Sequence, residues 1–281
     1  SLFDSSLTTV GLSSSASTGV TTFSNLMQQV SAEMRNGAAD LTLSYETAVL
    51  KGTADVQALT VQGLTAGTFT ANGAETITIA TELTKSTLTD VAGTGLKTIK
   101  VTGDKALKVS TALTEKTIDA SGNSGGVTIT LGTADQTVTG GSGDDVIDGF
   151  LDISNLDTIT GGAGNDTFKI ELAAKVTADA KTDAAAAGAL YGVSGFETID
   201  VASTNAAAEV ELASLTGITD VTAGASTRTI TITNTADDAG AVSYAFDLNG
   251  TSYTAASASL AGSQTTDLAA VATAIAAKID S

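Results

Sequence analysis

Residues 140–170 read GGSGDDVIDGFLDISNLDTITGGAGNDTFKI, and they contain two copies of one nine-residue pattern. The first copy begins at Gly140 and the second at Gly161, and both follow G-G-x-G-x-D-x-U-x, in which U is a large apolar residue. Glycine permits the positive φ angles of a tight turn, so backbone carbonyls can point inward. The last three residues of each copy are suited to a short strand whose apolar side chain, Ile147 or Phe168, points into the fold.

This nonapeptide is the repeat of parallel β-rolls that bind Ca²⁺ at their turns. Its aspartate adds an anionic oxygen, and hard oxygen ligands at a flexible site suit Ca²⁺. Turns on one side of such a roll are two repeats, or about 18 residues, apart. Asp145 and Asp166 are 21 residues apart, and the surplus lies in residues 152–157 (DISNLD), which replace a glycine turn. We therefore predict one calcium site clamped between the two glycine turns.

The candidate calcium ligands are carboxylate, amide and backbone carbonyl groups of the two turns and of the aspartates near them. They are Gly141, Gly143, Asp144, Asp145, Asp148, Asp157, Gly162, Gly164, Asn165 and Asp166. A second site that uses Asp135 and Asp157 stays open, because Gln136 stands where the pattern has an aspartate. The alternative to a metal site is a glycine-rich hairpin loop, which leaves two full matches to the pattern unexplained.

Apolar residues recur in step with these turns and beyond them. Inside the turn region the predicted register is Val138, Ile147, Ile159 and Phe168, with steps of 9, 12 and 9 residues. Elsewhere a short phrase with a central isoleucine recurs about every 20 residues, at Ile77, Ile99, Ile118, Ile199 and Ile218. A strand that recurs with this period is typical of a solenoid, in which each rung pairs with the next. The predicted fold class is therefore mainly β, a parallel β-solenoid or β-roll.

Three segments are predicted along the chain. Residues 1–50 form an N-terminal segment with a short helix at 23–35, because Phe23, Leu26, Val30 and Met34 are spaced for one helix face. Residues 51–226 form the solenoid, with residues 173–190 as a helix or an insertion loop. Residues 227–281 form a small unit in which a hairpin turns at Asn249-Gly250 and a helix follows at 268–278.

Composition excludes several classes of function. The formal net charge of −18 argues against binding to nucleic acid or to an anionic membrane surface. The chain has no His and no Cys, so it lacks the usual zinc ligands and the base of a hydrolytic triad. Its aromatic content of 4 % leaves few platforms for sugars. No apolar run of about 20 residues predicts a membrane span. We predict that the chain is not an enzyme.

Residues 55–170 resemble the repeat region of RTX-type calcium-binding bacterial surface-layer (S-layer) proteins. The likeness is carried by the phrases at residues 73–80 (GAETITIA), 97–103 (KTIKVTG) and 117–121 (TIDAS), followed by both glycine turns. It continues more weakly through residues 195–199 (GFETI). The chain departs from that family in having few glycine repeats, no recognisable polysaccharide-anchoring domain, and a C-terminal unit that we cannot match to the family.

The resemblance implies a protein that is exported by type I secretion, binds Ca²⁺ and assembles with copies of itself on the bacterial cell surface. The function expected is that of an extracellular, calcium-dependent structural protein. Its expected partners are other copies of the chain and a cell-surface polysaccharide, with no nucleic acid and no insertion into a membrane. The alternative is an RTX module of a secreted adhesin, or the β-roll tail of an exported enzyme.

Overall fold

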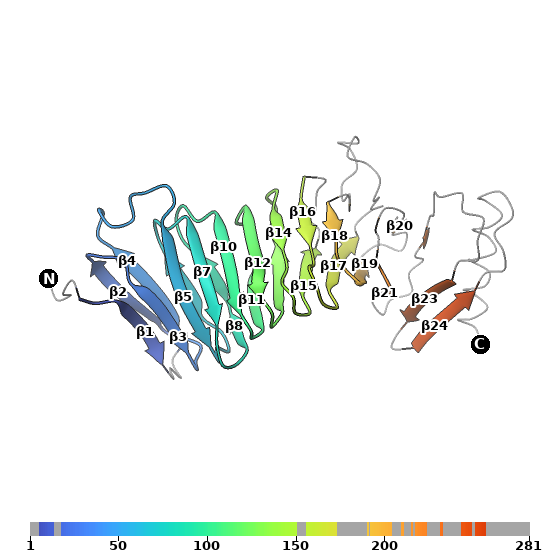
Figure 1. Cartoon of the computed structure of the whole chain (residues 1–281), viewed down its shortest axis with the longest axis horizontal. Coiled ribbons are helices and arrows are strands. Elements are labelled where there is room, and N and C mark those ends of the chain that lie inside the picture. Colours follow the sequence, from blue (N-terminus) through green and yellow to red (C-terminus); the bar gives the residue numbers. More distant parts are fainter. Residues whose placement is uncertain are drawn as a thin grey trace. The chain divides into compact units, whose positions relative to one another are not determined.

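The structure is a computed structural model of the chain. It describes residues 6–13, 18–150, 156–172, 190, 192–203, 209–210, 215, 217–223, 231–232, 243–248 and 251–256. These residues form strands and turns and include no helix. Apart from one antiparallel hairpin, the strands pair in parallel, and the chain coils into a β-solenoid, as the sequence predicts (Figure 1). The solenoid has about eight turns.

The chain divides into two compact units. The first contains Ser1–Asp148 and Leu156–Asp166, and the second contains Gly149–Asn155 and Thr167–Ser281. The glycine turns and both of their aspartates lie in the first unit. The boundaries predicted near residues 51 and 226 stay predictions.

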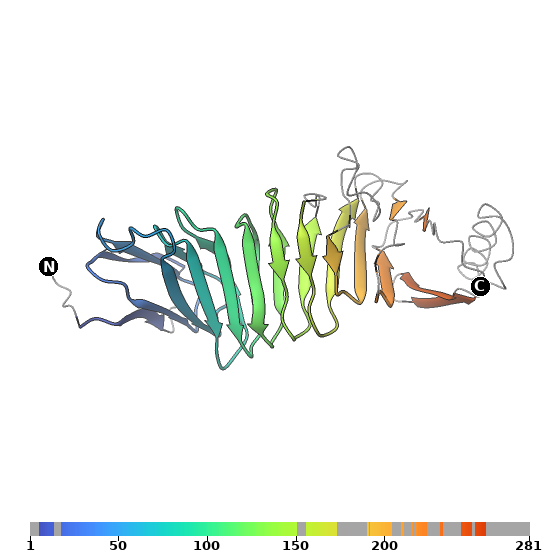
Figure 2. The ribbon, with the colours of Figure 1, turned by 45° about the horizontal axis from the view of Figure 1, so that its top comes forward.

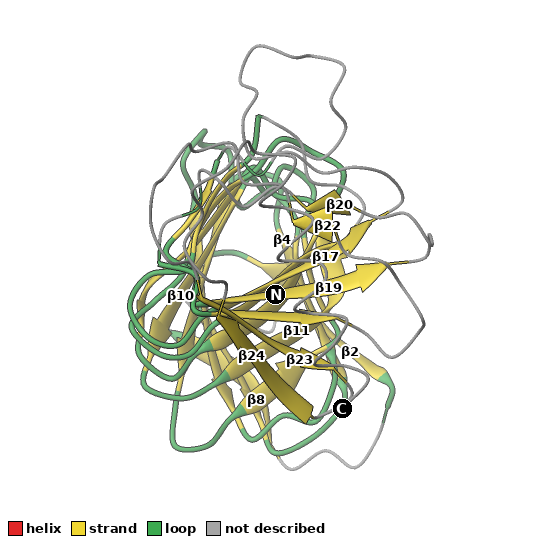
Figure 3. Ribbon diagram, turned by 90° about the vertical axis from the view of Figure 1, so that its right-hand side faces the viewer, coloured by secondary structure: helices red, strands yellow, loops and turns green. Residues whose placement is uncertain are grey.

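The first unit is a stack of rungs whose strands belong to three sheets, here called faces A, B and C (Figures 1 and 2). Face A contains β1 (Thr9–Ser13), β3 (Ser31–Arg35), β5 (Val56–Gln62), β7 (Thr76–Thr81), β10 (Thr98–Gly103), β12 (Thr117–Asn123), β14 (Thr137–Thr139) and β16 (Thr158–Thr160). Face B contains β2 (Val20–Leu26), β4 (Asp40–Tyr45), β6 (Thr68–Ala71) and β9 (Asp90–Ala92). Face C contains β8 (Ser86–Leu88), β11 (Leu107–Leu113), β13 (Val127–Leu131) and β15 (Val146–Phe150). The connecting loops gather along the corners between faces (Figure 3).

One column of apolar side chains sets the register of face A. Ile77 pairs with Ile99, and Ile99 pairs with Ile118, so the predicted steps of 22 and 19 residues are each one turn of the coil. The column continues through Val138 and Ile159. All five side chains are at most 1 % exposed. Because strand side chains alternate between two faces, a slip of one residue would bring these side chains into water.

The helix predicted at residues 23–35 is wrong. This segment forms the end of β2, a turn and the whole of β3. Val30, Ala32 and Met34 are buried and alternate with outward residues, which is the period of a strand rather than of a helix. Asn25 has a φ of 57°, and the pairing of β2 with β4 shifts register beside it. This irregularity places Leu26 in the interior and produces the helix-like spacing from Phe23 to Leu26.

The second unit also has parallel pairing, and it contains a hairpin. Its strands are β17 (Thr167–Leu172), β18 (Val193–Ser194), β19 (Thr198–Ser203), β20 (Glu209–Val210), β21 (Asp220–Ala223), β22 (Thr231–Ile232), β23 (Ser243–Leu248) and β24 (Thr251–Ala256). Phe168 stacks on Ile199 in register, and its ring lies 5.3 Å from that of Phe196. β23 and β24 pair antiparallel, which confirms the predicted hairpin. The predicted helix at 268–278 and residues 173–189 lie outside the described residues.

The register column gives a stability prediction. Ile99→Ala removes a side chain that is packed between Ile77 and Ile118, and should lower the free energy of unfolding by about 2–5 kcal/mol. Thr98→Ala, on the outward side of the same strand, should lower it by less than about 1 kcal/mol. Urea unfolding of both variants measures the difference. Equal losses would show that the column does not define the core.

Candidate calcium-binding turns

The two glycine turns lie directly on one another in adjacent rungs. The amide of Ala163 in the second turn donates to the carbonyl of Gly141 in the first, at 3.0 Å. In the same way Ser142 donates to the carbonyl of Asn123, at 2.9 Å. Residues 123–126 therefore form a third turn of the same stack. The structure thus confirms that the two predicted turns are neighbours, and it adds a third turn, at residues 123–126, to the stack.

Glycine is required in these turns because neighbouring backbones are in contact. A Cβ atom on Gly140 would lie 1.7 Å from the carbonyl oxygen of Gly161, and one on Gly162 would lie 2.2 Å from that of Gly141. Gly162 and Gly164 also have φ angles of 117° and 135°. The carbonyl oxygens of one turn therefore face the next turn at close range, as an ion clamped between turns would need.

The aspartate that ends each turn is fully buried. The carboxylate of Asp145 accepts hydrogen bonds from the amides of Val127 and Gly141, both at 2.6 Å. The carboxylate of Asp166 accepts one from the amide of Asp145, at 2.8 Å. Both aspartates are 0 % exposed. Each carboxylate thus caps an amide of the preceding rung, and Asp145 links three rungs.

Upstream the same position in the coil is apolar. Leu107 and Val127 pair in register, and each is 1 % exposed. The amide of Leu107 donates to the backbone carbonyl of Gly126 in the next rung. From Val127 onward a carboxylate replaces that carbonyl as the acceptor. The chain therefore changes at this corner from a neutral to an anionic interior.

Burial raises the pKa of Asp145, and the neighbouring Asp144 carboxylate acts in the same direction, whereas the hydrogen bonds from Val127 and Gly141 oppose them. A raised pKa means that the metal-free fold holds the proton of this acid more tightly than the unfolded chain does. This contribution to stability is therefore present at low pH and is lost as the pH rises through the pKa of Asp145. At neutral pH a nearby cation would stabilise the ionised carboxylate of Asp145.

A different corner carries Asp157, which is 5 % exposed. Its carboxylate accepts a hydrogen bond from the amide of Gln136, at 2.7 Å. The side-chain amide of Gln136 donates to the carbonyls of Leu113 and Glu115, at 2.9 and 2.8 Å. Its oxygen accepts from the amide of Gly132 at 3.0 Å. A neutral amide thus binds these carbonyls without a cation, which argues against the second site left open with Asp135.

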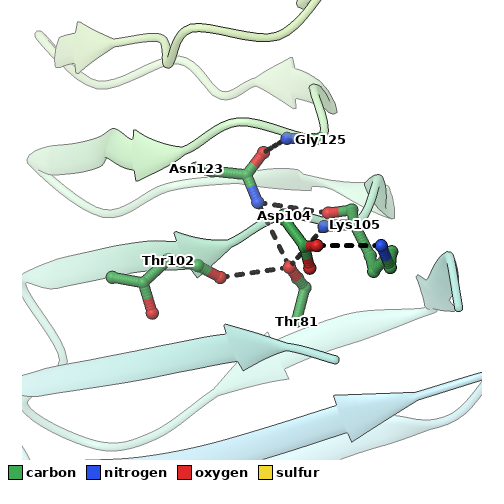
Figure 4. A network of polar contacts seen from close by, with 6 residues as sticks. All are labelled: Thr81, Thr102, Asp104, Lys105, Asn123 and Gly125. Atoms are coloured by element: carbon green, nitrogen blue, oxygen red, sulfur yellow. Dashed lines mark hydrogen bonds and ion pairs between the residues drawn. The ribbon is translucent and has the colours of Figure 1, made fainter. Parts of the chain in front are cut away.

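Asn123 has a similar role in the upstream rungs (Figure 4). Its side-chain nitrogen donates to the carbonyl of Lys105 at 3.1 Å and to the hydroxyl of Thr81 at 3.3 Å. Its oxygen accepts from the amide of Gly125 at 3.0 Å. Thr81 in turn donates to the carbonyl of Thr102. The network joins successive rungs with uncharged groups.

The structure brings most of the predicted ligands together, but not all of them. The two stacked turns hold Gly141, Gly143, Asp144, Asp145, Gly162, Gly164, Asn165 and Asp166. The exposed Asp144 accepts a hydrogen bond from the amide of Asn165, at 2.9 Å. Asp148 lies on β15 in register with Thr130, outside the turn. Asp157 lies at the corner of Gln136, so neither belongs with the paired turns.

The donor chemistry fits Ca²⁺. Among the described residues no three acidic side chains converge to form a metal site by themselves. An ion would therefore combine the Asp145 and Asp166 carboxylates with turn carbonyls, all of them hard oxygens. To reach it, the carboxylates would exchange some of their amide hydrogen bonds for the metal.

Comparisons of the chain with protein-family models, with curated proteins and with solved structures found no match. No helix among the described residues is long and apolar enough to span a membrane.

The stacking of the turns predicts the effect of two glycine substitutions. Gly95→Ala places a side chain at a φ of 92°, with its nearest atom 3.9 Å away, and should lower stability by about 1–2 kcal/mol. Gly162→Ala adds a clash with the backbone of Gly141 and should lower it by more than about 3 kcal/mol. Urea unfolding compares the two. Equal losses would mean that the turns are not in contact.

Proposed function

We propose that this chain is a calcium-stabilised structural β-solenoid that acts outside the cell and assembles with other copies into a surface layer or a related ordered array. The observation that carries the calcium part is the pair of fully buried carboxylates, Asp145 and Asp166, in stacked glycine turns. The array part rests on the resemblance to surface-layer proteins. Export by type I secretion, a bacterial cell-surface location and a polysaccharide partner rest on that resemblance as well.

The mechanism follows from the electrostatics of the turns. Without a cation, Asp145 and Asp166 are buried anions whose charges amide hydrogen bonds offset only in part. At low intracellular calcium these rungs are poorly stabilised, and the chain is open for export. Extracellular modules bind Ca²⁺ with dissociation constants of about 10⁻⁴–10⁻³ M, and millimolar calcium would fill the site after export. Because the site forms only in the folded rungs, binding adds to folding stability.

Calcium dependence should be confined to part of the coil. The upstream rungs use the neutral side chains of Asn123 and Thr81 between rungs, and Gln136 does the same at its own corner. These groups need no counter-ion. The rungs around Asp145 and Asp166 do. The described chain thus has a calcium-independent section, from which the calcium-dependent rungs can extend.

The second candidate is a module that does not form an array, either a segment of an adhesin or the β-roll tail of an exported enzyme. The same buried carboxylates favour it equally, since they concern folding and not assembly. Electron microscopy of calcium-loaded protein separates the two. Ordered sheets or filaments support the array, and dispersed monomers support the module. That the chain is not an enzyme stays a prediction.

Adding Ca²⁺ to chelated protein should increase the β-sheet signal in circular dichroism and should slow amide exchange selectively at residues 140–166. Asp145→Asn/Asp166→Asn should raise the calcium concentration of half-maximal change at least about tenfold, because each change removes a charge from the site. Asp104→Asn, which alters an exposed carboxylate, should leave it unchanged. A calcium titration without any gain of β signal would contradict the folding switch.

Gln136 offers a test in the opposite direction. Gln136→Asp removes the amide that binds the carbonyls of Leu113 and Glu115, and places a second carboxylate beside Asp157. The chelated variant should be less stable by about 2–4 kcal/mol, and saturating Ca²⁺ should recover part of the loss. Gln136→Ala provides the control that loses the amide without gaining a charge. Equal recovery of both variants by Ca²⁺ would show that the corner does not respond to charge.

A further inference from the structure

Charge is unevenly distributed along the first unit. Residues 85–116 contain six of the 13 basic residues of the chain and only three acidic ones. The six are Lys85, Lys97, Lys100, Lys105, Lys108 and Lys116. Residues 117–168 contain eight aspartates and no basic residue. Asp145, Asp157 and Asp166 are buried, so the surface charge of the described residues in this stretch comes from the exposed or half-exposed Asp119, Asp135, Asp144 and Asp148. A chain with a net charge of −18 therefore carries a local net charge of +3 directly before its most acidic stretch. We call these two regions the basic band and the acidic band.

The coil turns this sequence pattern into two neighbouring surfaces. Lys97 and Lys116 precede β10 and β12, two strands that pair in register, so the two lysines lie in adjacent rungs at one corner. Both are exposed, and neither forms an ion pair with a described residue. The exposed Asp135 lies at the same corner one rung further on. The corner therefore changes from positive to negative between adjacent rungs.

The outward side of face A follows the same order. Lys100 on β10 is paired with Asp119 on β12, and their charged atoms are 3.7 Å apart. This ion pair lies on the boundary between the two bands. At the corner between faces A and C, Lys105 comes first and is paired with the exposed Asp104 at 2.9 Å, and the exposed Asp144 follows two rungs later. The line through Lys97, Lys116 and Asp135 therefore carries the clearest change from positive to negative charge.

We propose that the basic band is an interface for a second copy of the chain, whose acidic band lies against it. The inference rests on the self-assembly in the proposed function, and it names the surface through which two copies would bind each other. Rungs are about 4.8 Å apart, so sliding one copy along the coil by two or three rungs opposes the bands. Charges more than about 8 Å apart are screened at physiological salt, so the two bands attract each other only in direct contact. This requirement fixes the offset between the two copies along the coil.

The charge of the whole chain favours this partner. Two copies with a net charge of −18 repel each other over most orientations, and the basic band is the region of the first unit where a copy meets attraction. An acidic polysaccharide is the other anionic partner that could bind there. Sugar-binding surfaces commonly present aromatic rings, and residues 85–116 contain no aromatic residue.

The test compares two lysine substitutions of equal charge in the full-length chain with saturating Ca²⁺. Lys116→Glu lies in the basic band, and Lys51→Glu changes another exposed lysine outside it. Lys116→Glu should weaken self-association about tenfold in sedimentation velocity, whereas Lys51→Glu should match the wild type. The wild-type association should also weaken with added NaCl. Both variants should keep the wild-type circular dichroism spectrum.

A charge exchange provides the second measurement. Lys97→Glu/Lys116→Glu and Asp135→Lys should each self-associate poorly, and an equimolar mixture of the two should associate about tenfold more tightly than either variant alone. Recovery in the mixture identifies the two bands as partners.

Four results would overturn the interface. One is equal association of Lys116→Glu and Lys51→Glu, and another is a mixture that associates no better than its components. The third is unchanged assembly of Lys116→Glu with loss of binding to polygalacturonate, which would assign the band to a polysaccharide. A wild type that gains β signal with Ca²⁺ but stays monomeric also contradicts the interface, while it leaves the calcium part of the proposed function standing.

Discussion

The hydrogen bond from the backbone amide of Asp145 to the carboxylate of Asp166 shows the constraint on which the solenoid depends. Each rung contains about 20 residues, and the chain changes direction several times within it. These turns bring backbone amides and carbonyls into the interior. Each of these groups needs a partner, because a buried unpaired polar group costs about 1–3 kcal/mol. In this chain the partner is usually supplied by the neighbouring rung. The apolar column through Ile99 sets the register. The hydrogen bonds at the corners determine whether the buried backbone groups of each rung are paired.

The chain meets this constraint with two chemistries. Asn123 and Gln136 both donate and accept through one amide group, so they connect rungs without adding charge. Asp145 and Asp166 only accept when ionised, and burial raises the pKa of Asp145 because its charge is poorly solvated there. The change from amide to carboxylate occurs within a few rungs of one continuous stack. A cation that interacts with the carboxylates would therefore affect a defined section of the coil, while the amide-linked rungs provide a template that does not require it.

The repeat was predictable from sequence, because a column of buried isoleucines requires similar spacing in every rung. The glycine turns were predictable as well, since close contact between neighbouring turns leaves no room for a Cβ atom at Gly140 or Gly162. The helix at residues 23–35 was predicted wrongly, because Asn25 disturbs the strand period and imitates a helical one. The turn at Asn123 was not predicted as part of the stack, since it lacks the aspartate on which the pattern depends. The role of Gln136 could not be read from sequence, because it depends on carbonyls that are more than 20 residues away along the chain.

The central claim is that the stacked turns ending in Asp145 and Asp166 form a cation site. Anomalous X-ray diffraction from crystals of the chain grown with Ca²⁺ tests it most directly. We predict an anomalous peak between the two turns, within bonding distance of at least one of the two carboxylates and of turn carbonyls. No peak there, with both carboxylates still bound to the amides of Val127, Gly141 and Asp145, would contradict the account.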